Sequence, residues 1–292
     1  NPMAHKDVLI AGASGLVGYA AVKHFGERAI ALSRRPPADL HGAMPMSVDL
    51  TDPAACRTAS SAWTHVTHLV YAALFELPGL VDGWRDDRQI HTNDAMLRNL
   101  LEALISVAPN LRHVTLLQGT KAYGVHVKPL QVPARENRSE MHEQKNFYWN
   151  QERYIRAAQT GQDWSWTILR PVLIVGSSVG SAMNVIPALG VYAAMAKRAG
   201  KTALDYPGGV GRVAQAVDAD LLARAIAWSG EEVKAYNEIF NLSNGDVFVW
   251  PNVWPAIADA LGFEAGEHVP RQLDREIRPR EAVWKAVCAA VK

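Results

Sequence analysis

Short apolar runs alternate with longer segments of mixed polarity along most of this chain. The runs that we interpret as strands lie at Val8–Ala11, Ala29–Leu32, Pro45–Val48, His68–Ala73, His113–Leu117, Trp166–Leu169 and Ile239–Leu242. The segments between them are long enough for helices, and this alternation is typical of a parallel sheet covered by helices on both faces. The pattern predicts an α/β protein built on a doubly wound parallel sheet.

The clearest helical period lies in the segment Trp84–Val107. Its apolar positions three and four apart are Leu97, Leu100, Leu101, Leu104 and Ile105. Such spacing places side chains on one face of a helix, and Pro109 stands where the pattern ends. We therefore predict a helix over Trp84–Val107.

The pattern loosens in the last third of the chain into Gly, Ser and Pro turns around a helix near Asn184–Arg198. No linker rich in glycine and serine separates this part from the strands before it. We expect residues 1–175 to form the sheet domain, with a returning strand near 237–243. Residues 176–292 are expected to form a smaller, mostly helical domain that binds the substrate.

Three glycines follow the first predicted strand at the head of a helical pattern. Gly12 permits a tight turn, Gly15 lets backbone amides approach a pyrophosphate, and Gly18 allows close packing of helix on strand. The unpaired N–H groups at the helix start also attract an anion. The motif predicts a dinucleotide site in a Rossmann-type fold, although three glycines can also mark an ordinary strand-to-helix turn.

The second predicted strand ends in Ser33-Arg34-Arg35, about where a protein that binds the 2′-hydroxyl of NAD carries an acidic residue. Guanidinium groups bind a 2′-phosphate through paired, charge-assisted hydrogen bonds. The expected cofactor is therefore NADP(H). The alternative is a pair of solvated arginines before a Pro-Pro turn.

Composition narrows the range of partners. Lys and Arg total 30 against 29 Asp and Glu in 292 residues, so charge gives no reason to expect nucleic acid or a membrane surface. Two cysteines make no disulfide framework, and no apolar run of 18 residues occurs. His65 and His68 lack the neighbours of a metal site. We expect a cytoplasmic protein without a bound metal, and a homodimer stays open.

Ligands of open α/β sheets collect beyond the carboxyl ends of the strands, so the residues that follow each strand are candidates for contact. Asp49 could accept a hydrogen bond from the adenine amino group, with Leu50 lining the ring. A helix cap or turn role for Asp49 is equally compatible with the sequence. Ala72, at the end of the fourth predicted strand, is a candidate for the same reason.

The Tyr-x-x-x-Lys motif of short-chain dehydrogenases is absent. Tyr148 stands at a plausible helix start, but Glu152 occupies the position four residues later. A lysine instead follows the fifth strand at Lys121, from where a cation could reach the Tyr148 hydroxyl and a nicotinamide ribose. Taken singly, Tyr148 also fits an aromatic packing cluster and Lys121 a solvated loop.

The segments Gly119-Thr-Lys-Ala-Tyr-Gly124 and Asn146-Phe-Tyr-Trp149 together resemble the progesterone 5β-reductase/iridoid synthase-like family, a divergent branch of the extended short-chain dehydrogenases. Further segments that look like its hallmarks are Ser33–Pro36, Asn93–Asn99, Ala108–Val114, Trp164–Trp166, Arg170-Pro171 and Ser243–Phe248. The resemblance runs through nearly the whole chain. It implies that Lys121 and Tyr148 are the catalytic pair.

The resemblance also implies a set of cofactor contacts. They are Gly12, Ser14, Gly15, Leu16, Arg34, Arg35, Asp49, Leu50, Pro171, Leu173 and Ser181. We add Gly18, Ser33 and Ala72, which belong to the glycine motif or stand at strand ends, and the pair Lys121 and Tyr148 itself. No metal ligand is implied.

Three residues depart from the family pattern. Ala122 replaces a histidine, Trp149 replaces a second tyrosine, and Leu74 stands where a tryptophan is common near the pocket. Plant members also continue with a helical segment beyond the part that matches Trp284. We therefore expect either a more open pocket or another element that covers it.

The family reduces activated carbon–carbon double bonds, so the resemblance implies an NADPH-dependent 1,4-reduction of an enone or enal, a small-molecule substrate. Hydride would reach the β-carbon while Tyr148 and Lys121 stabilise the enolate oxygen. Two rivals stay open at this point. One is a carbonyl reductase or sugar-nucleotide epimerase or dehydratase on the same scaffold, and the other is a non-catalytic NADP(H)-sensing module.

Overall fold

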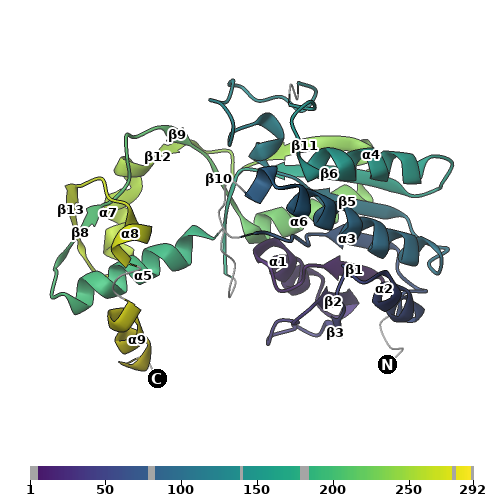
Figure 1. Ribbon diagram of the computed structural model, residues 1–292, viewed down its shortest axis with the longest axis horizontal. Coiled ribbons are helices and arrows are strands. Elements are labelled where there is room, and N and C mark those ends of the chain that lie inside the picture. Colours follow the sequence, from purple (N-terminus) through teal and green to yellow (C-terminus); the bar gives the residue numbers. More distant parts are fainter. Residues whose placement is uncertain (1–5, 78–82, 139–140, 178–183, 278–280, 291–292) are drawn as a thin grey trace. The chain divides into compact units, whose positions relative to one another are not determined.

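Seven strands form one parallel sheet in the computed structural model, which describes residues 6–77, 83–138, 141–177, 184–277 and 281–290. The strands are β1 (Val8–Ala11), β2 (Ala29–Ser33), β3 (Met44–Ser47), β4 (His68–Tyr71), β5 (His113–Leu117), β6 (Ser165–Pro171) and β11 (Glu238–Leu242). They lie in the order β11-β6-β5-β4-β1-β2-β3, and all neighbours are parallel (Figure 1). The predicted Rossmann-type α/β fold is confirmed.

The order of the strands reverses between β1 and β4. The chain builds outward from β1 to β3, then returns to place β4 on the other side of β1. The carboxyl ends of β1 and β4 are Ala11 and Tyr71, which are paired in register. Ligands of open parallel sheets bind at such a reversal, so Gly12 and Ala72 follow directly into the expected site.

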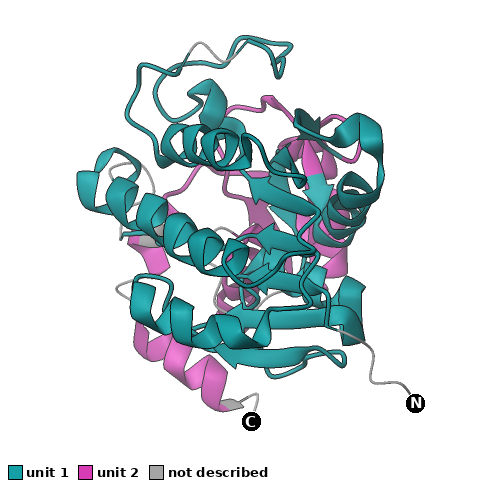
Figure 2. Cartoon of the chain, turned by 90° about the vertical axis from the view of Figure 1, so that its right-hand side faces the viewer, with its two compact units in different colours: residues 1–181, 217–243 teal, residues 182–216, 244–292 magenta. Residues whose placement is uncertain are grey.

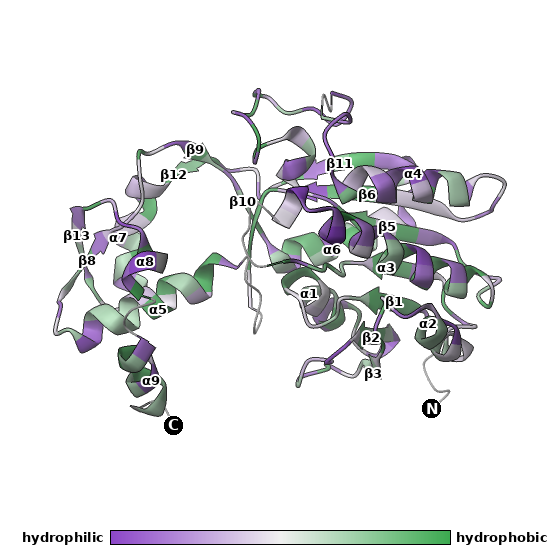
Figure 3. Cartoon of the chain, viewed as in Figure 1, coloured by the Kyte–Doolittle hydropathy of each residue, from purple (hydrophilic) through white to green (hydrophobic). Residues whose placement is uncertain are grey.

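Helices cover both faces of the sheet, which explains why central strands such as β1 and β2 are buried without alternation, whereas the edge strand β3 alternates between half-buried and exposed positions. Leu9 and Ala11 point into one core cluster, and Val8 and Ile10 into the other. Figure 3 shows hydrophobic residues along these central strands and mixed polarity along the covering helices. The first cluster packs under α2 (Pro53–Ala59), α3 (Asp87–Ile105) and α4 (Phe147–Gln159), and the second under α1 (Leu16–Phe25) and α6 (Ala219–Glu231).

The helix predicted over Trp84–Val107 is shorter in the structure, where α3 spans Asp87–Ile105. Its start is set by Asp86, whose side chain accepts a hydrogen bond from the Arg88 amide at 2.7 Å. Trp84 therefore belongs to a separate turn, η3 (Gly83–Arg85). An N-cap carboxylate satisfies a first-turn N–H group, so the helix begins after it.

Other short 3₁₀ turns are η1 (Gly26–Arg28), η2 (Ser60–Ala62), η4 (Thr120–Tyr123) and η5 (Val233–Ala235). Strand β7 (Leu173–Val175) pairs with β10 (Ala216–Asp218). No helix in the described part of the chain is both long and apolar enough to cross a membrane.

The chain divides into two compact units (Figure 2). Unit 1 comprises Asn1–Ser181 and Val217–Ser243, and unit 2 comprises Ala182–Ala216 and Asn244–Lys292. The part of the chain that returns to unit 1, Val217–Ser243, is longer than the returning strand expected near residues 237–243. The reason is that α6 also belongs to it, with Leu222 and Ile226 buried against the sheet.

Unit 2 has its own small core. Its elements are α5 (Val185–Arg198), β8 (Ala203–Tyr206), β9 (Val213–Ala214), β12 (Phe248–Val249), α7 (Trp250–Ala260), β13 (Glu264–His268), α8 (Leu273–Ile277) and α9 (Glu281–Ala290). Helix α5 begins directly after Asn184, whose side chain accepts from the Ile186 amide. Trp254 is buried and donates its indole N–H to the Leu204 carbonyl at 2.8 Å. A role for this unit in substrate binding stays a prediction.

Candidate active site

The glycine turn between β1 and α1 is built for close backbone approach. Gly12 has φ +83°, and a Cβ there would lie 2.6 Å from the Ala72 carbonyl oxygen. A Cβ at Gly18 would overlap the Gly12 carbonyl oxygen. The Gly12 amide donates to the Leu32 carbonyl at 2.9 Å, which ties the turn to β2. Only glycine fits these two positions without moving the backbone.

The N-terminus of α1 stands open to an anion. Its N-cap is Gly15, and no side chain of the described residues caps the helix. The first turn carries no acidic residue, and Ser14 beside it is exposed. Leu16 differs, because its side chain is buried. The helix dipole and uncapped amide groups favour a phosphate here, so the turn fits the pyrophosphate of a dinucleotide.

The end of β2 carries an orphaned polar atom. The Ser33 hydroxyl is buried and has no hydrogen-bond partner among the described residues. A buried hydroxyl without a partner costs free energy unless a ligand or water satisfies it. Arg34 and Arg35, which follow, are exposed and so available to a phosphate. These three residues fit the adenosine end of a bound dinucleotide.

Asp49 takes the turn role that the sequence left open. Its Oδ1 accepts hydrogen bonds from the Thr51 amide at 2.9 Å and the Thr51 hydroxyl at 2.7 Å. These bonds, with a smaller contribution from the Arg34 charge, hold the pKa of Asp49 below its ordinary value. Leu50 is buried in the core, and contacts of Asp49 and Leu50 with an adenine stay predictions.

Tyr148 lies in the first turn of α4, with its hydroxyl at the carboxyl end of β5. Asn146 caps the helix by accepting from the Tyr148 amide at 3.0 Å. The Tyr148 hydroxyl oxygen lies 3.5 Å from the point that a Cβ would take at Gly119. The phenol oxygen is thus within van der Waals contact of the position that a side chain at Gly119 would take. Phe147, Tyr148 and Trp149 are all buried in one aromatic cluster, so Tyr148 both packs and presents its hydroxyl.

Lys121 lies in η4, directly after β5. Its ammonium nitrogen is 4.1 Å from the ring centroid of Trp84. Burial lowers the pKa of Lys121 below its ordinary value, and the Glu76 carboxylate partly offsets this. The indole nitrogen of Trp84 donates to Glu76 Oε1 at 3.1 Å. Lys121 is therefore a half-buried amine that stands over an aromatic ring.

Trp84 joins the two candidate groups. The Tyr148 ring meets it edge-on, with centroids 5.2 Å apart and planes inclined by 72°. Burial and the Glu76 charge raise the pKa of Tyr148 above its ordinary value, while Arg170 acts in the opposite direction. The phenol is thus protonated at neutral pH, which makes Tyr148 a hydrogen-bond donor rather than a phenolate.

Glu152, four residues after Tyr148, faces a different partner. Its Oε2 lies 3.6 Å from Arg170, and its Oε1 lies 3.0 Å from Arg156. Arg170 is 2% exposed and donates to Gln118 Oε1 at 2.7 Å. A buried guanidinium needs such a carboxylate. Glu152 therefore anchors α4 to the carboxyl ends of β5 and β6.

The remaining predicted contacts fall into two groups. Pro171 ends β6 with its carbonyl oxygen 3.7 Å from the same point beside Gly119, and Leu173 is half-buried in β7. Ser181 lies outside the described residues. Sequence reasoning missed Trp84 and Glu76. Trp84 stands in a polar stretch before α3, and only its unusual position there could have drawn attention to it.

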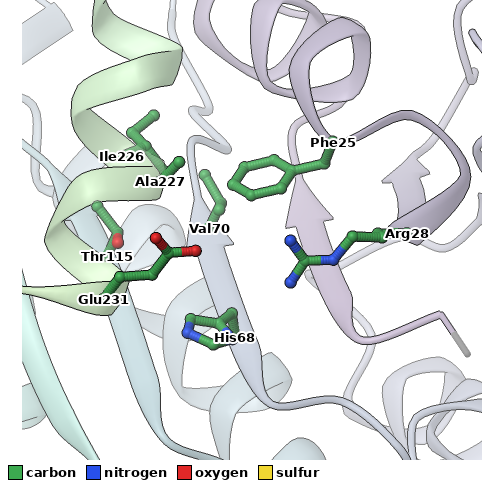
Figure 4. A pocket seen from close by; sticks show the side chains of 8 residues that line it. All are labelled: Phe25, Arg28, His68, Val70, Thr115, Ile226, Ala227 and Glu231. Carbon is green, nitrogen blue, oxygen red and sulfur yellow. The ribbon is translucent and has the colours of Figure 1, made fainter.

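A small cavity lies at the opposite edge of the sheet (Figure 4). It is lined by Phe25, Arg28, His68, Val70, Thr115, Ile226, Ala227 and Glu231. Its volume of about 10 Å³ is close to the space that one water molecule needs. It therefore offers no room for a substrate. The described residues hold no cluster suited to a metal ion, and Cys56 and Cys288 are unpaired.

Comparison with known proteins gives three results. Residues 63–280 match the family described as the PRISE-like Rossmann-fold domain. An (S)-8-oxocitronellyl enol synthase of Antirrhinum majus is 34% identical over 240 residues, which are 77% of this chain and 58% of that protein. A 3-oxo-Δ(4,5)-steroid 5-β-reductase of Arabidopsis thaliana is 32% identical over 302 residues, covering 95% of this chain and 75% of that protein.

Among solved structures, the UDP-glucose 4-epimerase of Thermus thermophilus in complex with NAD matches with a TM-score of 0.68. The match covers 91% of this chain and 87% of that one at 19% identity. A likeness at this identity concerns the fold alone. The chain spans only 58% of the length of the Antirrhinum relative, so that protein's activity does not transfer with the match.

Proposed function

This chain belongs to the family of PRISE-like Rossmann-fold proteins, as the motifs around Lys121 and Tyr148 predicted, and from that premise we propose that it is an NADPH-dependent reductase of activated carbon–carbon double bonds. The printed names of two relatives support this chemistry. One is a reductase of a 3-oxo-Δ(4,5)-steroid, in which a carbonyl is conjugated to a double bond. The other forms an enol.

The observation that carries the proposal is the placement of Tyr148 and Lys121 against one indole at the carboxyl edge of the sheet. The Tyr148 hydroxyl lies beside Gly119, and the glycine turn lies at the same edge. A substrate oxygen bound beside Gly119 would meet a neutral donor with a cation close by. Such a pair suits an oxygen that becomes negative.

In the proposed mechanism, the glycine turn and the start of α1 would hold a reduced nicotinamide cofactor, which would supply a hydride to the β-carbon of the enone. The π electrons of the double bond then shift toward the carbonyl, and the oxygen takes the enolate charge. Tyr148 donates a hydrogen bond to this oxygen, and the Lys121 ammonium adds a favourable field in a partly buried site. Water later supplies the proton at the α-carbon. The protein thus stabilises charge where it develops.

The choice of NADPH over NADH rests on Arg34 and Arg35, which are exposed beyond β2 with no acidic residue beside them. Their guanidinium groups suit a 2′-phosphate, and the orphaned Ser33 hydroxyl offers a further donor at the same strand end. The glycine turn and the open N-terminus of α1 suit the pyrophosphate.

The test compares an enone, an enal and a saturated ketone. NADPH consumption is followed with 2-cyclohexen-1-one, 2-hexenal and cyclohexanone, and the products are identified by mass. We expect consumption with the first two and a saturated carbonyl product. An allylic alcohol, or turnover of cyclohexanone alone, would instead identify a carbonyl reductase. Tight NADPH binding without any turnover would identify a sensing module.

A further inference from the structure

Trp84 is the side chain against which both candidate catalytic groups rest. It lies in η3, and its side chain is almost fully buried. The Lys121 nitrogen stands over its ring at 4.1 Å, and Tyr148 meets it edge-on at 5.2 Å. Lys121 and Tyr148 come from segments far apart in the sequence. The Trp84 indole therefore contacts both Lys121 and Tyr148, which no short stretch of backbone connects.

The geometry of both contacts is favourable. The face of an indole carries negative potential, which attracts an ammonium group within about 6 Å of the ring centroid. Inclined aromatic pairs with centroids about 4.5–7 Å apart are likewise attractive. The face of Trp84 thus favours the charged form of Lys121, whereas burial favours the neutral form. The same contacts limit where the Tyr148 ring and the Lys121 nitrogen can lie.

Trp84 is itself held in place from α3. Its indole N–H donates to Glu76, and the residue before Glu76 is fixed by a buried asparagine. The Phe75 amide donates to Asn93 Oδ1 at 2.8 Å, and Asn93 Nδ2 donates back to the Phe75 carbonyl at 2.7 Å. Asn93 is fully buried in α3. The indole is therefore anchored to a rigid helix through hydrogen bonds and not by packing alone.

We infer that Trp84 is a positioning residue, which holds the Lys121 ammonium and the Tyr148 phenol together beside Gly119. This inference rests on the proposed function. It assigns a role in the reaction to a residue that stands outside the two motifs carrying Lys121 and Tyr148.

A purely structural role makes a different prediction. Trp84 is a large buried aromatic, so its truncation destabilises the protein whatever else it does. Trp63 provides the matched control. It is also buried, and its indole donates to Met46 within the core beneath α2. A readout that Trp84→Leu moves and Trp63→Leu does not is therefore specific to the site.

The first measurement is the titration of Lys121 in the cofactor-free protein. Lysine labelled with ¹³C at Cε is followed by NMR against pH, and the Lys121 signal is assigned by its loss in Lys121→Arg. Trp84→Phe and Trp84→Leu are both apolar but differ in the aromatic face. We expect the Lys121 midpoint about one pH unit lower in Trp84→Leu than in Trp84→Phe. Equal midpoints would overturn the inference.

Fluorotryptophan supplies a measurement that does not depend on a variant that might unfold. Fluorination weakens the negative potential of the indole face with little change in shape. We expect the Lys121 midpoint to fall stepwise as fluorine atoms are added to the tryptophans of the wild-type chain. The same labelling in Trp84→Phe should leave the midpoint unchanged. A shift of equal size in both proteins would assign the effect to other tryptophans.

Kinetics then separates this inference from the proposed function. With 2-cyclohexen-1-one, we expect kcat to fall about tenfold in Trp84→Leu, with most of it restored in Trp84→Phe and none lost in Trp63→Leu. KM for NADPH should stay near the wild-type value. An unchanged kcat in Trp84→Leu would count against the inference. If the wild type reduces no enone, the proposed function fails, while the Lys121 titration still decides the role of Trp84.

Discussion

The two edges of the sheet both carry titratable residues, yet only one edge is built as a site. At the carboxyl edge, the Tyr148 hydroxyl lies beside Gly119, and the Lys121 nitrogen stands over the Trp84 ring. At the amino edge, His68 and His113 lie on neighbouring strands with ring centroids 6.3 Å apart. The cavity at this amino edge is large enough only for about one water molecule.

The two edges differ in what surrounds their polar groups. His113 Nδ1 lies 2.8 Å from the Ser165 hydroxyl, and His68 Nε2 lies 3.3 Å from the Gly230 carbonyl oxygen. Burial lowers the pKa of both imidazoles, and His113 Nε2 has no hydrogen-bond partner among the described residues. At the carboxyl edge, the Tyr148 hydroxyl lies beside Gly119, and α1 begins without a side-chain cap among the described residues. The carboxyl edge thus combines a glycine turn with an uncapped helix start, which suits an anionic ligand, whereas the amino edge holds a cavity for about one water molecule.

Among changes that test this contrast between the two edges, removal of the Tyr148 hydroxyl should have the largest effect on activity. In Tyr148→Phe, we expect kcat for enone reduction to fall by about 10²–10³, because one well-placed donor to a developing oxyanion contributes that much. The dissociation constant of NADPH, measured by fluorescence titration, should stay nearly unchanged. An unaltered kcat would remove Tyr148 from the proposed mechanism.

Loss of the arginines beyond β2 should affect the cofactor without affecting the chemistry. In the double variant Arg34→Ser and Arg35→Ser, we expect the preference for NADPH over NADH to fall by about 10–100-fold, because charge-assisted hydrogen bonds to the 2′-phosphate are lost. The measurement is kcat/KM with each cofactor. Arg112→Ser, at an exposed position before β5, serves as the control. An unchanged preference would mean that Arg34 and Arg35 do not bind the 2′-phosphate.

We expect the titration of His113 at the amino edge to change the stability of the protein and not its activity. Burial, with a smaller contribution from His68, lowers the pKa of His113 from 6.5 to about 3. As pH falls below 6.5, the His113 imidazole therefore binds a proton in the unfolded chain but stays neutral in the folded chain. We expect this to cost about 2 kcal/mol of unfolding free energy at pH 5, an amount that His113→Gln should largely abolish.

Urea unfolding of the wild type and of His113→Gln at pH 7 and pH 5 measures this pH dependence of the unfolding free energy. His65→Gln, at an exposed position, should show the wild-type pH dependence. If His113→Gln loses as much stability between the two pH values as the wild type, His113 is not the group responsible.

The smallest expected effect concerns the alkaline limb of activity. Burial lowers the pKa of Lys121, so Lys121 loses its proton at a lower pH than an exposed lysine does. The rate of enone reduction should fall over the same pH range. An arginine keeps its charge at all accessible pH values. We expect Lys121→Arg to flatten this limb, although its kcat at neutral pH falls severalfold because the guanidinium differs in shape. A limb unchanged by the substitution would point to another group.

Much of the fold follows from local pattern. Each of the seven apolar runs forms a strand of the sheet within a few residues of its predicted bounds, because the strands of a sheet covered on both faces are rich in apolar residues. The glycine turn is local in the positive φ of Gly12 and in the packing of Gly18 on Gly12, although Gly12 also lies against the distant residue Ala72. Helix α3 was predicted too long because the cap at Asp86 was overlooked.

The carboxyl edge depends on contacts that no local pattern contains. Neither the indole of Trp84 between Lys121 and Tyr148 nor the ion pair of Glu152 with Arg170 follows from spacing along the chain. The sequence by itself determined the strands, the glycine turn and the family motifs, because these arise from short-range periodicity and backbone geometry. Tertiary structure alone decided which side chains meet, because those contacts form only after distant segments are packed against the same sheet edge.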